Sequence, residues 1–314
     1  MSYYLNDLRI LKELGYQVHI ATRAHELRPA DWYYVWWWTW GFQAVSFARL
    51  LRRPVIVTGA LHAHEYVQRP LLQRKLIEYS FTRASANIFI SESEMRECTR
   101  VLDVRAPHFA PLVVDTQRYV PSDQQRDPSL IVTIVKMTEP NGRRKCVPEM
   151  LEAFRQIHDT RPDTRLLIAG EHLDGYPLFL ARARELGLGD VVTFSGVVSE
   201  DEKIRLMQRC GVYLQPTHFE GFGVAILEAM SCGAPIVTSP VGAVPEVAGD
   251  CAELVDGGSP DAIAKAALDL LENPARRTAL STMARARATK LYDYETRKTR
   301  LGTVIDDVLS RSPR

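Results

Sequence analysis

The sequence predicts an α/β protein made of two doubly wound domains, each a parallel sheet covered by helices. Three observations support this. The chain has 314 residues, about twice the length of an average domain. Segments with helical periodicity alternate with short β-branched runs in both halves, as in proteins with parallel sheets. Between the halves, residues 120–129 (VPSDQQRDPS) form a polar stretch with two prolines, which is typical of a linker.

The first half begins with a helical pattern. Leu5, Leu8, Leu11 and Leu14 recur at helical spacing, and Gly15 ends the run. The other elements expected before the linker are strands 17–22, 33–37, 55–58 and 86–90 and helices 43–51, 71–82 and 93–102.

An unusual apolar stretch, WYYVWWWTW, covers residues 32–40. It is far shorter than the roughly 20 residues that a membrane-spanning helix needs. Its aromatic and β-branched content favours a buried strand. An aromatic anchor at a membrane surface is the alternative interpretation.

The second half repeats the alternation of strands and helices. Ser199 and Glu202 have the Ser-x-x-Glu spacing of a capping box and start one of the helices. The elements expected are strands 130–136, 165–169, 191–194, 212–215 and 235–238 and helices 149–158, 178–186, 199–209, 224–230 and 261–271.

Composition and charge exclude some classes of function and favour a location in the cell. There are 39 Lys and Arg residues against 38 Asp and Glu, so a general nucleic-acid binder is not expected. Residues 1–112 carry 14 cations against 10 acids, which suits ordinary surface variation or contact with an anionic acceptor or lipid surface. The five cysteines form no CxxC pair and the first residues show no secretion signal, so a cytoplasmic protein is expected.

The most informative segment is a glycine loop that leads into a short apolar helix. Gly221 and Gly223, with Phe222 between them, let backbone N–H groups approach a ligand, and the helix that follows offers free donors with partial positive charge. This combination favours a phosphate or diphosphate. Glu220 in the loop and Glu228 in the helix can each accept hydrogen bonds from the hydroxyls of a sugar. A nucleotide sugar would satisfy the whole arrangement.

The segment EGFGVAILEAMSCGAPIV, residues 220–237, resembles the Glu-x7-Glu signature of the retaining glycosyltransferases of family 4. LLIAG at 166–170, VVTFSG at 191–196 and VVDTQRY at 113–119 follow the same family order. The resemblance implies a GT-B fold of two Rossmann-like domains facing across a cleft. We therefore expect an acceptor-side domain at 1–122, a nucleotide-sugar-binding domain at 123–290, and a helix within 291–314 that returns to the first domain.

The resemblance also implies roles for individual residues. Glu220 would contact the donor sugar, Gly221 to Gly223 the sugar and phosphate, and Glu228 the ribose. A family Lys that neutralises the diphosphate corresponds to Lys145, although Cys146 stands where the family usually has Gly. The accompanying Arg corresponds to Lys136 by position in the strand, with Arg143 and Arg144 as alternatives.

A family His near the reacting sugar carbon corresponds to His62 or His64, which the sequence does not separate. No metal is expected, because this fold needs no bound divalent ion and no further ligands cluster near His62 in the sequence. The family's first strand and its glycine loop would precede the first helix of this chain, so the first domain is expected to lack them.

These features predict a retaining glycosyltransferase that moves a sugar from a nucleoside diphosphate to a hydroxyl of a sugar, a lipid-linked or a small-molecule acceptor. Peripheral contact with the inner face of a membrane through the first domain is a further expectation. The alternative is a non-catalytic nucleotide-sugar-binding or scaffold subunit.

Overall fold

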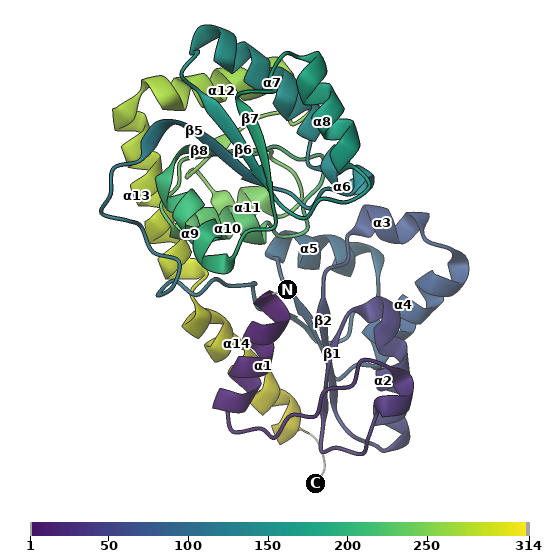
Figure 1. The fold of residues 1–314 in the computed structure, drawn as a ribbon. Coiled ribbons are helices and arrows are strands. Elements are labelled where there is room, and N and C mark those ends of the chain that lie inside the picture. Colours follow the sequence, from purple (N-terminus) through teal and green to yellow (C-terminus); the bar gives the residue numbers. More distant parts are fainter. Residues whose placement is uncertain (1, 312–314) are drawn as a thin grey trace. The chain divides into compact units, whose positions relative to one another are not determined.

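The computed structural model describes residues 2–311, except for the side chains of residues 2, 3 and 63–65. Its contacts divide the chain into two compact units. Unit 1 contains the residues up to Val113 together with those from Tyr294 onward, and unit 2 extends from Val114 to Asp293. Each unit is a parallel sheet covered by helices (Figure 1), so the predicted α/β class is confirmed.

Unit 1 has a four-stranded parallel sheet in the order β1-β2-β3-β4. Val55 and Val57 pack into one hydrophobic cluster, with α2 and α4, while Ile56 packs into another, with α1 and α14. The sheet is therefore buried on both faces (Figure 1). The elements are α1 (Ser2–Glu13), the 3-10 turn η1 (Ala24–Glu26), β1 (Tyr33–Trp36), α2 (Trp38–Leu50), β2 (Val55–Gly59), α3 (Ala63–Gln68), α4 (Leu71–Arg83), β3 (Ala86–Phe89), α5 (Glu92–Val101), β4 (Pro107–Phe109) and α14 (Tyr294–Ser310).

The strand predicted at residues 33–37 is present as β1, but the apolar stretch 32–40 as a whole is not the single buried strand that was predicted. Strand β1 ends at Trp36, Trp37 has a left-handed φ of 77°, and helix α2 starts at Trp38. Trp38 is buried inside unit 1, where its ring stacks on Phe81 at 4.7 Å and its indole N–H donates to Asn87 at 2.9 Å. Burial of this large ring favours a helix at the point where the local aromatic composition predicted a strand.

The strand predicted at residues 17–22 was also wrong. Within the described part of the chain these residues pair with no strand. Tyr16 and Val18 reach the hydrophobic cluster beneath α1 and α14, but Ile20 is 61% exposed. Tyr16 and Val18 therefore anchor this extended segment on the hydrophobic cluster, but the segment does not join the sheet.

Unit 2 has a six-stranded parallel sheet in the order β10-β9-β8-β5-β6-β7. Helices α7, α8 and α12 supply the hydrophobic cluster on one face, and α9 and α10 lie on the other (Figure 1). The elements are β5 (Asp127–Ile134), α6 (Glu139–Arg144), α7 (Val147–Thr160), β6 (Arg165–Ala169), α8 (Tyr176–Glu185), β7 (Val192–Gly196), α9 (Glu200–Arg209), β8 (Cys210–Gln215), α10 (Val224–Ser231), β9 (Ile236–Thr238), α11 (Val244–Ala248), β10 (Glu253–Leu254), α12 (Pro260–Glu272) and α13 (Pro274–Leu291).

The strand order of unit 2 has a functional consequence. The chain starts at β5, builds outward through β6 and β7, and then returns to β8 on the other side of β5. In open α/β sheets, ligands bind at this reversal, outside the carboxyl ends of the two central strands. The segments that follow β5 and β8 are therefore where a ligand site is expected.

Unit 2 starts earlier in the chain than the expected boundary at residue 122. Residues 114–122 belong to it because side chains of unit 2 hold their backbone. Arg285 donates to the carbonyls of Thr116 and Tyr119 at 3.0 and 2.8 Å, and the Ser231 hydroxyl donates to Tyr119 O at 2.6 Å. At the other end of the chain, helix α14 belongs to unit 1.

Candidate functional site

A glycine loop connects β8 to α10, as the sequence predicts. Gly223 precedes the helix with a left-handed φ of 94°. Gly242, with a φ of +55°, faces the loop, and a Cβ on it would lie 1.9 Å from the carbonyl oxygen of Glu220. Only glycine allows this approach. The backbone around Glu220 is therefore fixed by tight packing.

Lys145 and Glu220 form an ion pair between the segments that follow β5 and β8. Their side chains are 9% and 15% exposed, and Arg144 Nη1 lies 3.8 Å from the same carboxylate. Burial alone would raise the pKa of Glu220, but Lys145 and Arg144 outweigh this effect and hold that pKa below its ordinary value. The Glu220 carboxylate is therefore held in its ionised form beside the basic side chains of Lys145 and Arg144.

Hydrogen bonds to backbone carbonyls hold the two segments that carry this pair. The Thr217 hydroxyl and the His218 N–H both donate to the carbonyl of Arg144, at 3.0 and 2.8 Å. In return, Arg144 Nη1 donates to the carbonyl of Phe219 at 2.6 Å. The glycine loop and the end of α6 are thus joined on both sides of the ion pair, which preorganises its charges.

Glu228 lies in a second charged cluster, on the α10 helix. The Lys203 ammonium donates to its Oε1 at 2.9 Å and the Tyr119 hydroxyl at 3.1 Å. The same Tyr119 hydroxyl, which has one hydrogen to share between the two acids, also contacts Glu200, and Lys203 lies 3.0 Å from Glu200. Burial raises the pKa of Glu228, although Lys203 opposes the effect. A carboxylate held this firmly on an apolar helix suits the recognition of hydroxyl groups.

The structure does not join every predicted residue to the site. Lys136 is 62% exposed and pairs with Glu171 at 3.3 Å, and Arg143 is 58% exposed and pairs with Glu139 at 2.9 Å. Of the three cations considered alongside Lys145, the structure brings Arg144 to Glu220.

The glycine loop contains a buried aromatic side chain. Phe222 is 3% exposed and its ring packs edge-on against Tyr292 with centroids 5.9 Å apart. Its backbone N–H donates to the Glu220 carboxylate. Phe222 thus anchors the loop through its side chain, while its backbone helps to hold the carboxylate. Gly221 lies between these two residues.

His62 lies in unit 1, where it precedes helix α3 and is 8% exposed. Its carbonyl accepts the first hydrogen bond of α3, from the Tyr66 N–H at 2.9 Å. The side chain of His64 is outside the described residues. The expectation that one of the two histidines faces a donor sugar therefore stays a prediction.

Sequence reasoning missed Lys203, Glu200 and the role of Tyr119. Lys203 follows the capping box that the sequence predicts, and Ser199 Oγ indeed accepts the Glu202 N–H at 3.1 Å. The sequence around Lys203 does not reveal its partner, because Glu228 lies 25 residues further along the chain. Only the packing of α9 against α10 brings them together.

Among the described residues, no helix combines the length and apolar character that a membrane-spanning segment requires.

Comparisons with known proteins agree with this geometry. The family described as Glycosyl transferases group 1 matches residues 130–287. The MMP alpha-(1->4)-mannosyltransferase of Mycolicibacterium hassiacum is 30% identical over 207 residues, which are 65% of this chain and 49% of that protein. A GDP-mannose-dependent alpha-(1-6)-phosphatidylinositol monomannoside mannosyltransferase of Mycolicibacterium smegmatis is 29% identical over 214 residues, 61% of this chain and 54% of that protein. The chain thus spans about half the length of these curated relatives.

Solved structures share the fold. Sucrose-phosphate synthase from Thermosynechococcus elongatus superposes with a TM-score of 0.79 and 20% identity, covering 90% of this chain and 74% of that one. Anabaena HepE, solved with UDP and glucose, superposes with a TM-score of 0.76 and 17% identity, covering 96% of this chain and 81% of that one. The expected GT-B fold is therefore confirmed. Because the family match covers half of the residues, the chain belongs to the group 1 glycosyl transferases.

Proposed function

We propose that this protein is a retaining glycosyltransferase that moves a sugar from a nucleoside diphosphate to an acceptor hydroxyl. The observation that carries the proposal is the ion pair of Lys145 and Glu220, with Arg144 3.8 Å from the carboxylate, beside the glycine loop of α10. The family membership of residues 130–287 and the mannosyltransferases among the relatives support it.

The charges suit the departure of a diphosphate. As the bond between the sugar and the phosphate breaks, negative charge grows on the diphosphate and positive charge on the sugar carbon. Lys145, Arg144 and the amino end of α10 stabilise that negative charge in a site that is already organised, which is the most effective form of electrostatic catalysis. Glu220 accepts hydroxyl hydrogens of the sugar, and Glu228 accepts those of the ribose.

The acceptor proton needs no separate base in unit 2. In a retaining transfer the acceptor attacks from the side on which the diphosphate leaves, so the departing phosphate oxygen takes the proton. The reaction also needs no divalent ion, because Lys145 and Arg144 supply the positive charge at the leaving group. Turnover should accordingly stay within about twofold when Mg²⁺ or Mn²⁺ is added to chelator-treated protein.

The donor is the first property to test. One relative's name specifies GDP-mannose, so GDP-mannose leads the panel, followed by UDP- and ADP-sugars. The assay measures free nucleotide released in the presence of sugar and lipid-linked acceptors. If one donor is consumed, the enzyme proposal holds. If nucleotide binds and every donor stays intact, the alternative of a non-catalytic nucleotide-sugar-binding subunit is correct.

Unit 1 offers a surface for a lipid-linked acceptor. At the start of α4, Leu71 and Leu72 are 67% and 72% exposed, next to the exposed Lys75. Apolar side chains beside a cation suit the surface of an anionic membrane, here on its cytoplasmic side. Replacing both leucines by Asp should abolish sedimentation with anionic vesicles. Val197→Asp, at an equally exposed position of unit 2, should not.

A further inference from the structure

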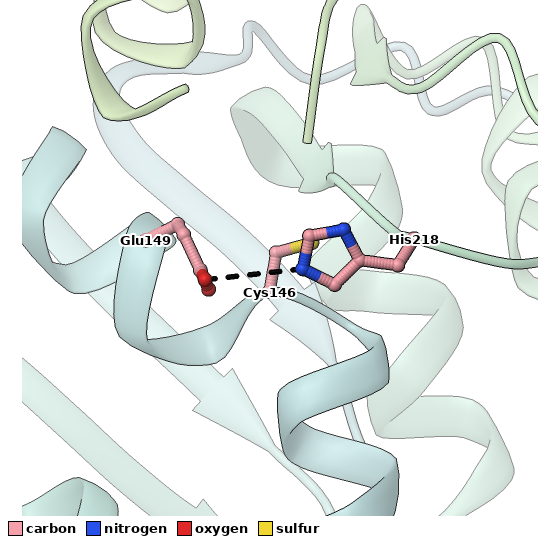
Figure 2. A group of neighbouring side chains, drawn as sticks. All are labelled: Cys146, Glu149 and His218. Carbon is pink, nitrogen blue, oxygen red and sulfur yellow. Dashed lines mark ion pairs between the residues drawn. The ribbon is translucent and has the colours of Figure 1, made fainter. Parts of the chain in front are cut away.

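Three side chains with metal-binding atoms converge next to the charged pair of unit 2. The sulfur of Cys146, a carboxylate oxygen of Glu149 and an imidazole nitrogen of His218 all lie within 4.8 Å of one another. His218 Nε2 is 3.8 Å from Glu149 Oε1, and Figure 2 shows the three side chains pointing toward one another from α7 and the glycine loop. The proposed sugar transfer uses none of these groups.

The local backbone places the three groups together. Cys146 precedes α7 with a left-handed φ of 50°, which is uncommon for a residue other than glycine, and Glu149 follows in the first turn of that helix. His218 comes from the glycine loop, where its N–H donates to the carbonyl of Arg144 at 2.8 Å. The backbone that carries the three side chains is thus held by main-chain contacts that do not depend on an ion.

The cluster contains a polar atom without a partner. Among the described residues, Glu149 Oε2 is buried and accepts no hydrogen bond. Leaving a buried carboxylate oxygen without a hydrogen bond is unfavourable. Its neighbour, the Cys146 sulfur, makes a long contact with the carbonyl of Arg144 at 3.9 Å. A cation between these groups would satisfy both.

The electrostatic surroundings also favour a cation. The carboxylates of Glu149 and Asp256 lie near the Cys146 sulfur and attract a cation, while the neighbouring Lys145 opposes it. Asp256 lies close by: a Cβ on Gly258 would lie 3.4 Å from its Oδ1 and 3.5 Å from the His218 ring. A cation bound by the three side chains would therefore lie beside the Glu149 carboxylate, with Asp256 as a second acid nearby.

We propose that Cys146, Glu149 and His218 bind a single thiophilic divalent cation of the Zn²⁺ class. Sulfur, imidazole nitrogen and carboxylate oxygen are the ligands that Zn²⁺ takes in proteins, whereas Mg²⁺ and Ca²⁺ prefer oxygen alone. Binding forms a bond from the metal to the thiolate and releases the thiol proton to solvent. Three protein ligands leave a fourth position for water. His218 is 52% exposed, so the ion can enter from solvent.

The ion would connect two segments of the donor site. Cys146 follows Lys145 directly, and His218 stands two residues before Glu220. A metal held by both segments would therefore brace the ion pair from outside without touching the donor. The proposal concerns binding of the ion, and it does not depend on sugar transfer.

The test uses the full chain, freed of metal with a chelator, and titrates it with Zn²⁺ against a chromophoric competitor. We expect one tightly bound equivalent. In His218→Ala, an exposed position that should not affect folding, the affinity should fall by more than about 100-fold, since loss of a ligand exceeds the loss from a supporting contact. Co²⁺ should show a thiolate charge-transfer band that Cys146→Ser removes.

Matched controls separate this site from nonspecific binding. His172→Ala and Cys251→Ser change a histidine and a cysteine of unit 2 outside the cluster, and both should bind Zn²⁺ like the parent protein. Equal affinity in the parent and in His218→Ala would overturn the proposal, as would a parent protein that binds no equivalent. No nucleotide sugar is present, so the result is independent of whether a donor is ever consumed.

Discussion

Unit 1 and unit 2 each contain a largely buried ion pair between a cation and a carboxylate. In unit 1, Arg297 binds Asp7 through two parallel hydrogen bonds of 2.5 and 2.8 Å, and both side chains are 1% exposed. In unit 2, Lys145 binds Glu220 at 9% and 15% exposure. The two pairs have similar charges, but their surroundings differ in ways that separate a structural role from a functional one.

The pair of unit 1 is closed. Arg297 also donates to the carbonyls of Ala110 and Pro111 at 2.6 and 2.9 Å, and the Tyr34 hydroxyl donates to Asp7 at 2.7 Å. These contacts connect α1 and α14 with the segment that follows β4. A buried pair whose hydrogen bonds are saturated in this way has no capacity left for a ligand and acts as a fixed junction.

The pair of unit 2 is open by comparison. Lys145 has three ammonium hydrogens and no planar fork, and Glu220 lies at the glycine loop, where a ligand can approach the backbone. Arg144, 3.8 Å from the carboxylate, provides a second charge that can respond when a diphosphate arrives. Saturation of its hydrogen bonds, more than burial, therefore distinguishes an ion pair that stabilises the fold from one that can exchange partners.

The largest effect is expected from breaking the closed pair. Arg297→Met leaves Asp7 charged and buried without its partner, and the free energy of unfolding should fall by about 3–5 kcal/mol. Urea denaturation measures this. Lys298→Met is the matched control: it breaks a pair with Glu13 that is 27% and 32% exposed, and should change stability by less than about 1 kcal/mol.

A double variant sharpens this prediction. Asp7→Leu combined with Arg297→Met leaves no unpaired charge and should regain part of the stability that Arg297→Met loses. If the single variant were as stable as the parent protein, the interpretation of this pair as a structural junction would be wrong.

Breaking the open pair should affect activity more than stability. Lys145→Met removes a charge that stabilises the departing diphosphate, so the rate of nucleotide release should fall about 10²–10³-fold. The free energy of unfolding should fall less than in Arg297→Met, because Arg144 remains near Glu220. Rates with saturating donor and thermal melts test both statements. A large loss of stability with unchanged turnover would assign Lys145 a structural role.

The two carboxylates of unit 2 should differ in what they control. Glu228→Gln weakens hydrogen bonds to the ribose, and nucleotide affinity should fall about 10–100-fold, as for the loss of charged hydrogen bonds. Glu220→Gln should lower the rate of transfer and leave nucleotide affinity within about threefold. Calorimetric titration with nucleotide and initial rates separate the two effects. Equal effects of both changes would contradict the assigned roles.

The sequence predicts elements well where one signal decides them. The strand at 165–169 lies where it was predicted, and the helix at 224–231 extends the prediction by one residue, because short apolar runs end at Gly170 and begin after Gly223. The stretch 32–40 was mispredicted because its aromatic composition suits a strand or a buried helix equally. The bend at Trp37 depends on the packing of the next residue, Trp38, against Phe81 and Asn87, which the local sequence does not reveal.

The site follows the same rule. The motif singles out Glu220, Glu228 and Lys145 as candidates, and the structure places Glu220 in the glycine loop, Glu228 in α10 and Lys145 directly after α6. Lys203 could not be predicted, since its partner is distant in the chain. The choice among the neighbouring cations could not be made either, because it depends on which side of the short helix α6 faces the glycine loop.

The smallest effect is expected at Arg144, which we compare with its neighbour Arg143 on α6. Arg144→Gln removes the charge near Glu220 and the hydrogen bond to the Phe219 carbonyl, so transfer should slow about tenfold. Arg143→Gln removes an exposed pair with Glu139 and should change the rate by less than about twofold. Initial rates with the same donor decide between them. If Arg143→Gln proved the more damaging, α6 would have to turn when the donor binds, and the open pair of unit 2 would be a resting arrangement that the ligand replaces.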